Sequence, residues 1–315
     1  MPMPRSTGWL IVIVFGGVAL GGLGLPAWMI SVGLSAMSQG IVVLGLVVLM
    51  RAGLISFGQG LYFGLGGYAV GVLSLEFGIT DAFLRVIAAA LAAAAVGLLL
   101  GCLLRRYRGI FFAMLSLAFS MIFYGLLVKN QNLGSTDGFR VLASTFAGRP
   151  PTGGANQLWL FLFACLLSAV CALAVHRYFR STLGWLATAI RDNETRVEYL
   201  GCSVNAAVHL KLVLCSALAG IGGALSAMTV GHIDPAITYW TTSGELVFVA
   251  ILGGAGSVFA PFLGALVFQV VHTLALAMLP HAWHVILGGV LLASILFMPD
   301  GLWSAIARRR ERSHG

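Results

Sequence analysis

The sequence predicts an all-α, polytopic membrane protein: a bundle of about eight to ten transmembrane helices, some of them short or broken. Of its 315 residues, 59% are apolar and only 9% are charged, whereas a soluble domain has about 25% charged residues. The mean hydropathy is +0.99. When this apolar chain is divided into spans of about 20 residues, little is left for a soluble domain, which excludes a cytosolic enzyme. We therefore expect one transmembrane domain over 1–315.

Polar or charged breaks divide the chain into apolar runs of membrane-span character. Arg5 precedes the first run as in a signal peptide, but Pro26 and Trp28 lead into a further apolar run, so we interpret it as a retained span. Two runs, 61–75 and 246–256, are rich in glycine and short for a hydrocarbon core of about 30 Å, so each is expected to be a broken or half-spanning helix. The runs are 8–30, 33–50, 61–75, 83–104, 109–128, 158–176, 211–231, 246–256, 258–279 and 284–298.

Basic residues predict the orientation, because cytoplasmic loops of membrane proteins are enriched in lysine and arginine. Counting spans places both termini and Arg51 on the same side as the basic clusters, and it places 76–82, 129–157, 232–244 and 280–283 on the other. The net charge of +8 is thus a topology signal, and no nucleic-acid partner is expected. The clusters are Arg105, Arg106 and Arg108; Arg177, Arg180, Arg191, Arg196 and Lys211; and Arg308, Arg309, Arg310 and Arg312. Lys129, Arg140 and Arg149 are exceptions on the opposite side.

Two glycine-interrupted apolar stretches lie in the two halves of the chain: GLISFGQGLYFGLGGYAVG at 53–71 and LVFVAILGGAGSVFAPFLGA at 246–265. Segments of this kind in corresponding positions indicate a translocation pathway. The alternative is close helix packing through small residues. A carboxylate at Glu245 would either line the pathway or cap a helix N-terminus. The pathway candidates are Ser56, Gln59, Tyr62, Tyr68, Ser243 and Glu245.

The most polar interior stretch is the expected cytoplasmic loop at 179–210. Apolar residues at 183, 186, 190, 197 and 200 fall broadly on one face of a helix from Leu183 to Leu200. Gly201 is placed to end that helix. The charged residues point elsewhere and would meet a protein partner; an interfacial helix on lipid headgroups is the alternative.

Motifs for chemistry are absent from the sequence. It has no GxxxxGK[ST], GxGxxG, HExxH or GxSxG pattern, so we expect neither ATP hydrolysis nor another enzymatic activity from this chain. The five cysteines form no CxxC pair and lie mostly in or beside apolar runs, so we expect no metal site and no disulfide framework.

Several of these stretches together resemble a known family. They are TLGWLATAIRDNETRVEYLGCSVNAAVHLK (182–211), LVLCSALAGIGGALSAMTVGHIDP (212–235) and SGELVFVAILGGAGSVFAPFLGAL (243–266), with 53–71, STDGF (135–139) and FMPDGLW (297–303). They resemble the permease subunit of branched-chain amino-acid ABC importers, the LivM type. The likeness extends from about Gly40 to Trp303 and is more specific for the family than for the substrate, since related permeases carry urea and other small polar solutes.

The resemblance implies an importer of the bacterial inner membrane with both termini cytoplasmic. In it, two permease subunits form the path, two ATPase subunits use ATP and magnesium, and an extracytoplasmic solute-binding protein delivers the substrate, while this chain binds no cofactor. A self-contained channel or ion-driven carrier is the rival from another class. The loop helix resembles the segment that docks into the ATPase, although Glu194 and Gly201 are seven residues apart where the general importer signature has six. The coupling candidates are Ala189, Arg191, Asp192, Asn193, Glu194 and Gly201.

Overall fold

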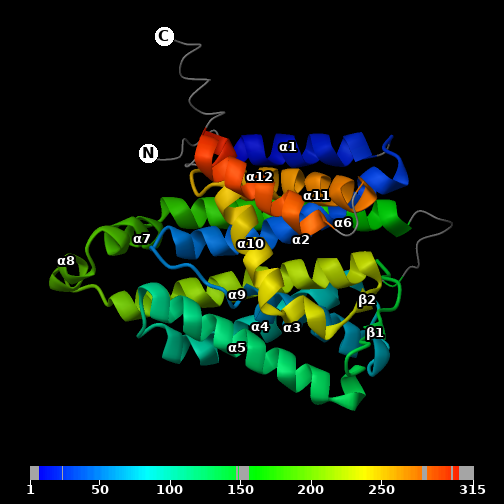
Figure 1. Cartoon of the computed structure of the whole chain (residues 1–315), viewed down its shortest axis with the longest axis horizontal. Coiled ribbons are helices and arrows are strands. Elements are labelled where there is room, and N and C mark those ends of the chain that lie inside the picture. Colours follow the sequence, from blue (N-terminus) through cyan, green and yellow to red (C-terminus); the bar gives the residue numbers. More distant parts are fainter. Residues whose placement is uncertain are drawn as a thin grey trace, which may run out of the picture.

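The computed structural model describes residues 7–22, 24–146, 148, 156–278, 282–298 and 301–304. Within these ranges the chain forms a helical bundle (Figure 1), and each predicted apolar run corresponds to one of its helices. Six helices are long and apolar enough to span a membrane: α2, α4, α5, α6, α9 and α11. The bundle helices are α1 (Thr7–Gly22), α2 (Ala27–Met50), α3 (Gln59–Leu75), α4 (Ala82–Leu104), α5 (Gly109–Lys129), α6 (Asn156–Arg180), α9 (Val204–Val230), α10 (Trp240–Gly253), α11 (Ala260–Met278) and α12 (Trp283–Phe297).

The all-α polytopic class is thereby confirmed, but several predicted boundaries are wrong; α10, for one, begins at Trp240, six residues before the predicted run. The chain breaks between Gly22 and Ala27 rather than near residue 31, because Pro26 lacks an N–H and takes an extended conformation at the start of α2. Helix α9 begins at Val204, seven residues before the predicted span. Lys211, the first residue of the predicted span, therefore lies well inside this helix, and its side chain is fully buried.

Helices α2 and α9 form the centre of the bundle. Helix α9 packs against α2, α3 and α4, and glycines make this close packing possible. A Cβ at Gly223 would collide with the carbonyl oxygen of Phe63 in α3, and one at Gly66 would collide with the carbonyl of Gly220. The small residues of the first glycine-rich stretch thus do serve helix packing, as the alternative interpretation held.

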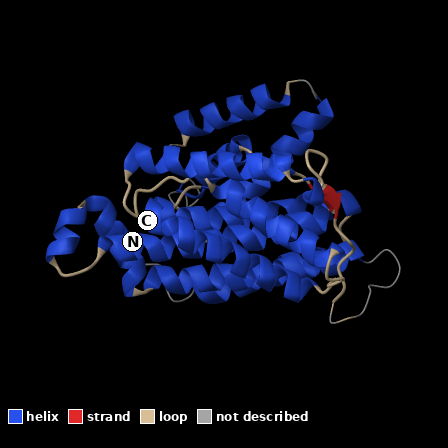
Figure 2. Cartoon of the chain, turned by 90° about the horizontal axis from the view of Figure 1, so that it is seen from below, coloured by secondary structure: helices blue, strands red, loops and turns tan. Residues whose placement is uncertain are grey.

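The two ends of the bundle differ in structure. Two short helices, α7 (Thr182–Asp192) and α8 (Glu194–Tyr199), project from one end, as Figures 1 and 2 show. At the opposite end, β1 (Phe139–Arg140) and β2 (His232–Ile233) form an antiparallel pair, near the 3₁₀ helix η1 (Gln131–Leu133). We call these the α7–α8 end and the sheet end.

The loops group at the two ends as the basic residues predict. At the α7–α8 end, Arg108 contacts Glu194 and Arg51 contacts Ala255. At the sheet end, Thr145 forms a bridge to Asp81. The break 232–244 belongs only in part to the sheet end, because its second half turns back into the bundle. Arg5, Arg149 and the basic tail Arg308–Arg312 lie outside the described residues.

An unpredicted arginine organises the sheet end. The side chain of Arg85, near the start of α4, is fully buried. Its guanidinium donates hydrogen bonds to the carbonyls of Ile79 and Leu142, both at 2.9 Å, and to Ser144 Oγ at 3.3 Å. Because a buried charge needs such partners, Arg85 fixes two loops to one another.

Candidate functional site

The segment expected to couple to an ATPase contains two helices, so the predicted single helix from Leu183 to Leu200 is wrong. The backbone leaves the helical conformation at Asn193 (φ −163°, ψ 103°). Its side-chain Oδ1 accepts a hydrogen bond from the Arg196 N–H at 2.9 Å and so caps α8. Asparagine favours such caps over helix interiors, since its amide competes for backbone groups. The segment is also shorter than the predicted loop, covering 181–203 between α6 and α9.

The predicted apolar face is only partly buried. Ile190 and Val197 are buried against the bundle, whereas Leu183 and Leu200 are exposed, the latter by 78%. Tyr199 and Leu200, at the end of α8, are exposed although they closely follow the buried Val197. The exposed large apolar side chains of the segment 181–203 are Leu183, Trp185, Tyr199 and Leu200.

Gly201 ends α8 as predicted. Its φ is +81°, a left-handed conformation that glycine adopts without strain. Its N–H donates to the Glu198 carbonyl at 2.9 Å, and Cys202 N–H donates to the Val197 carbonyl at 3.4 Å. These bonds satisfy the last carbonyls of the helix.

The coupling candidates differ in how exposed their side chains are. Ala189, Asp192 and Asn193 are exposed, and so is Arg191, although its Cγ lies 3.4 Å from where a Cβ on Gly53 would be. Glu194 is not simply presented to a partner as expected. Its carboxylate accepts from Arg108 Nε at 2.7 Å.

Arg108 connects three parts of the α7–α8 end. Besides Glu194, its guanidinium donates to Asn205 Oδ1 at 3.3 Å and to the Tyr107 carbonyl at 3.0 Å. Arg108 belongs to the short connection between α4 and α5, and Asn205 to the first turn of α9. Arg108, which the sequence identified only as a topology marker, thus adds polar links to the packing of Ile190 and Val197 that joins the projecting helices to the bundle.

A second arginine, Arg51, joins further segments at this end. It follows α2, and its Nε and Nη2 donate to the Ala255 carbonyl at 3.2 and 3.0 Å. Its guanidinium also lies 3.7 Å from the ring centroid of Phe179, just before α7. Burial lowers the pKa of Arg51 to about 10, so the side chain remains charged at neutral pH.

Two segments without α-helix, one before α3 and one before α10, meet inside the bundle. Residues 51–58 run inward from the α7–α8 end, and 231–239, including η2 (Pro235–Thr238), run inward from the sheet end. At the meeting point, Ser243 Oγ accepts from Gly60 N–H at 2.8 Å. Gln59 Nε2 donates to Cys215 Sγ at 3.0 Å, near the middle of α9. We call this contact region the central junction.

The central junction contains three of the predicted pathway residues: Ser56, Gln59 and Ser243. All three are buried, and Ser56 Oγ accepts from the Gly58 N–H within its own turn. Ser56 and Ser243 thus accept from backbone N–H groups at the start of α3, which have no partner within that helix and must find one inside the protein when hydrocarbon surrounds it.

Two serines of α5 that the sequence analysis missed complete the junction. Ser116 Oγ accepts from Phe57 N–H at 3.0 Å, and Ser120 Oγ donates to the Thr238 carbonyl at 2.8 Å. Tyr124, four residues further on, packs against Tyr239. The i, i+4, i+8 spacing of these polar groups in an apolar helix was the available signal.

The two tyrosine candidates lie apart from one another. Tyr62 is in the first turn of α3 and is 4% exposed. Tyr68 lies further along α3, where its ring packs edge-on against Phe139 of β1 at 5.6 Å. Its hydroxyl is buried without a hydrogen-bond partner among the described residues.

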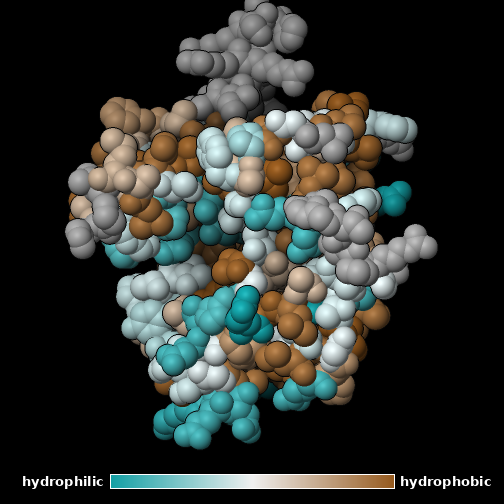
Figure 3. Space-filling model, turned by 90° about the vertical axis from the view of Figure 1, so that its right-hand side faces the viewer, coloured by the Kyte–Doolittle hydropathy of each residue, from teal (hydrophilic) through white to brown (hydrophobic). Residues whose placement is uncertain are grey.

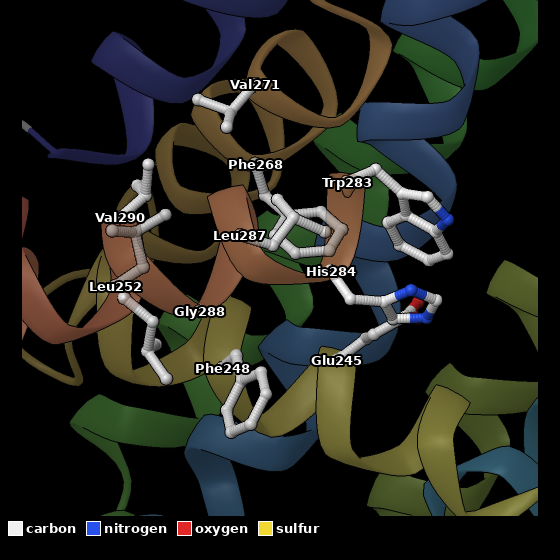
Figure 4. A pocket seen from close by; sticks show the side chains of 11 residues that line it. Glu245, Phe248, Leu252, Phe268, Val271, Trp283, His284, Leu287, Gly288 and Val290 are labelled. Atoms are coloured by element: carbon white, nitrogen blue, oxygen red, sulfur yellow. The ribbon is translucent and has the colours of Figure 1, made fainter. Parts of the chain in front are cut away.

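Glu245 lies at a separate cavity of about 110 Å³ between α10, α11 and α12 (Figure 4). It is the sixth residue of α10, too far along to cap that helix, since N-terminal capping and dipole effects act within the first turn. Its carboxylate and the His284 ring point into the same space. The remaining lining is mostly apolar and includes Phe248, Leu252, Phe268, Trp283 and Leu287.

Residues 28–296 match the family model described as "Branched-chain amino acid transport system / permease component". The chain belongs to this family. The expected resemblance is thereby confirmed: the chain is a permease subunit of an ABC importer, and the family is one of transport proteins in the bacterial inner membrane. No solved structure matches the chain at a significant level.

Several curated relatives fit the same family. The high-affinity branched-chain amino acid transport system permease protein LivM of Salmonella typhimurium is 27% identical over 297 residues, covering 86% of this chain and 69% of that protein. LivM of Escherichia coli K12 is 28% identical, covering 83% and 67%. The autoinducer 2 import system permease protein LsrC of Klebsiella pneumoniae is 29% identical over 188 residues, covering 56% and 50%.

Proposed function

We propose that this chain forms half of the path by which branched-chain or related amino acids are imported. In this proposal it pairs with a second permease subunit, its termini are cytoplasmic, and it is driven by two ATPase subunits at the α7–α8 end. A solute-binding protein delivers substrate at the sheet end, and membrane lipid surrounds the bundle. The chain itself binds no cofactor, and ATP and magnesium are used by the ATPases.

The observation that carries the proposal is the projecting α7–α8 segment. It exposes Trp185, Tyr199 and Leu200 beside the charged Arg191 and Asp192. Aromatic and apolar side chains with a charged rim are typical of protein interfaces. Since the sequence contains no nucleotide-binding motif, a partner at this surface would supply the energy for transport.

The contacts of the segment provide routes for transmitting movement. Arg108 links α8 to the starts of α5 and α9, and Arg51 links the end of α6 to the α10–α11 connection. The α10–α11 connection and residues 51–58 lead directly to α10 and α3, which meet at the central junction. A displacement of α7 and α8 would therefore shift the two short helices against one another, which is the rearrangement that alternating access needs.

Reconstituted uptake tests the proposal. The chain, its partner permease, the ATPases and the solute-binding protein are placed in proteoliposomes, and entry of labelled leucine, isoleucine and valine is measured with and without ATP. ATP-dependent uptake of these amino acids is expected, while urea and autoinducer 2 enter at background rates. Preferential uptake of either of those solutes would replace the substrate assignment. Solute entry without ATPases, at the same rate, would indicate a channel instead.

A further inference from the structure

The sheet end contains a pocket that lies apart from the predicted pathway residues. It has a volume of about 520 Å³ and opens between α2, α6, α9 and the β1–β2 pair. This volume lies within the range of small-molecule sites, about 300–1,000 Å³. Figure 3 looks onto this end, where hydrophilic and hydrophobic side chains both border a hollow near the centre.

Two basic side chains stand together at the pocket. The register of the sheet places Arg140 directly opposite His232, and both line the pocket. No lining residue is acidic, and within the described ranges Arg140 has neither a hydrogen bond nor an ion pair through its side chain. The lining therefore supplies no counter-charge to Arg140, and an anion held between Arg140 and the His232 ring would provide one.

The inner part of the pocket has a different chemistry. Leu34, Leu160 and Met228 form its apolar wall and are nearly inaccessible to solvent. Asn156 Oδ1, also at the pocket, is buried and has no hydrogen-bond donor among the described residues. A buried acceptor of this kind costs free energy unless a donor reaches it.

The pocket is closed toward the interior of the bundle. Below Leu34 and Met228, α2 and α9 are in direct contact, with Ser38 Oγ donating to the Gly222 carbonyl at 2.8 Å. A solute entering here would be held rather than conducted. The pocket is also distinct from the central junction and from the Glu245 cavity, since it shares no lining residue with either.

We propose that this pocket binds an apolar α-amino acid at the sheet end. The carboxylate would lie between Arg140 and His232, the ammonium would donate to Asn156 Oδ1, and the side chain would rest against Leu34, Leu160 and Met228. That the ligand is an amino acid rests on the proposed function. That it combines a carboxylate with an apolar side chain rests on the residues that line the pocket. This assignment also gives a role to Arg140, a basic residue on the side where basic residues are scarce.

Equilibrium binding to the full chain in lipid nanodiscs, without ATPases or binding protein, tests the proposal. Labelled leucine is expected to bind saturably. Competition by 4-methylpentanoate, which lacks the ammonium, is expected, while leucinamide, which lacks the carboxylate, competes at least tenfold more weakly than leucine. Inorganic phosphate, an anion without an apolar body, is expected to compete poorly.

Four variants test whether the binding occurs at this pocket. Arg140→Gln should weaken leucine binding at least tenfold, and Ser31→Leu, which fills the pocket and keeps its charges, should weaken it similarly. Lys129→Gln removes an exposed cation from the same end outside the pocket and should have no effect. Arg140→Lys keeps the charge and should bind leucine with an intermediate affinity. Binding by this variant would show that a change at position 140 leaves the fold intact.

Specific results would overturn the assignment: no saturable binding, full binding by Arg140→Gln, equal competition by leucinamide, or competition by phosphate as strong as by 4-methylpentanoate. Because the assay omits the ATPases and the binding protein, such a failure leaves ATP-driven uptake untouched. Conversely, loss of uptake in proteoliposomes with normal binding in nanodiscs would count against the proposed function alone.

Discussion

At the scale of single residues, Glu245 is the acidic side chain whose position is hardest to explain by structure alone. It lies in an apolar cavity beside His284 and does not cap α10. Placing an ionisable side chain among apolar residues of membrane helices costs free energy, and such side chains usually serve a function.

Glu245→Gln, which keeps the size and removes the charge, is expected to reduce amino-acid uptake severalfold while leaving membrane insertion and assembly normal. A carboxylate that orients the substrate ammonium cannot be replaced by a neutral amide. Uptake at equal expression is the measurement, with Glu76→Gln, an exposed glutamate at the end of α3, as the control. Wild-type uptake by the Gln variant would remove Glu245 from the path.

A glycine of α9 provides a second test at this scale. Gly223→Ala places a methyl group against the Phe63 carbonyl, so α3 and α9 must separate. The expected cost is about 1–3 kcal/mol of unfolding free energy. Thermal unfolding in detergent measures it, and Gly125→Ala on α5, where a Cβ meets nothing within 4 Å, should be neutral or stabilising. Equal unfolding midpoints for the two variants would contradict this packing.

At the scale of elements, the Arg108–Glu194 ion pair helps to join the α7–α8 segment to the bundle. Its two side chains are 27% and 37% exposed, so the pair itself contributes modestly, about 0.2–1 kcal/mol. The pair matters more for the position of α8 than for stability, because the same arginine also binds Asn205 at the start of α9.

Reversing either charge of this pair alone is expected to reduce ATPase-coupled uptake, and reversing both, as Arg108→Glu with Glu194→Arg, should recover a substantial part of it. The recovery follows because the electrostatic contact is restored with opposite polarity. Uptake and ATP hydrolysis in proteoliposomes are compared across the four proteins of the cycle. No recovery in the double variant would contradict a role for this ion pair in coupling.

Arg51 joins α2, α6 and the α10–α11 connection, so its loss should affect transmission more than stability. Arg51→Met is expected to raise the number of ATP molecules hydrolysed per amino acid imported, with Arg51→Lys intermediate, because lysine keeps the charge but cannot donate through two guanidinium nitrogens to one carbonyl. The measurement is the ratio of hydrolysis to uptake. A wild-type ratio in Arg51→Met would show that the contact with Ala255 does not transmit movement.

At the scale of the whole molecule, the orientation in the membrane follows from the grouping of loops at two ends. We expect Arg106→Cys and Thr195→Cys to be inaccessible to an impermeant thiol reagent added outside intact cells, and Thr136→Cys to be labelled. The assay requires replacement of the exposed Cys102 and Cys202. Labelling at position 195 from outside would invert the topology and with it the docking side of the ATPases.

The sequence by itself determined the class, the number of apolar runs, the family and the helix stop at Gly201. These features depend on composition, span length and local conformational preference, which a linear chain displays directly. It also identified the glycine-rich stretches 53–71 and 246–265, although only the structure showed that the segments without α-helix that enter the bundle from opposite ends are 51–58 and 231–239, the second of which lies outside the predicted stretch.

Only the tertiary structure decided which side chains meet. Ser243 binds Gly60, 183 positions away, and Arg108 binds Glu194, 86 positions away, so no periodicity relates them. The break at Asn193, the burial of Lys211 within α9 and the pairing of Arg140 with His232 likewise depend on how the helices and strands pack. In a membrane, unpaired backbone groups must find partners inside the protein, and these partners come from wherever the fold brings them into contact.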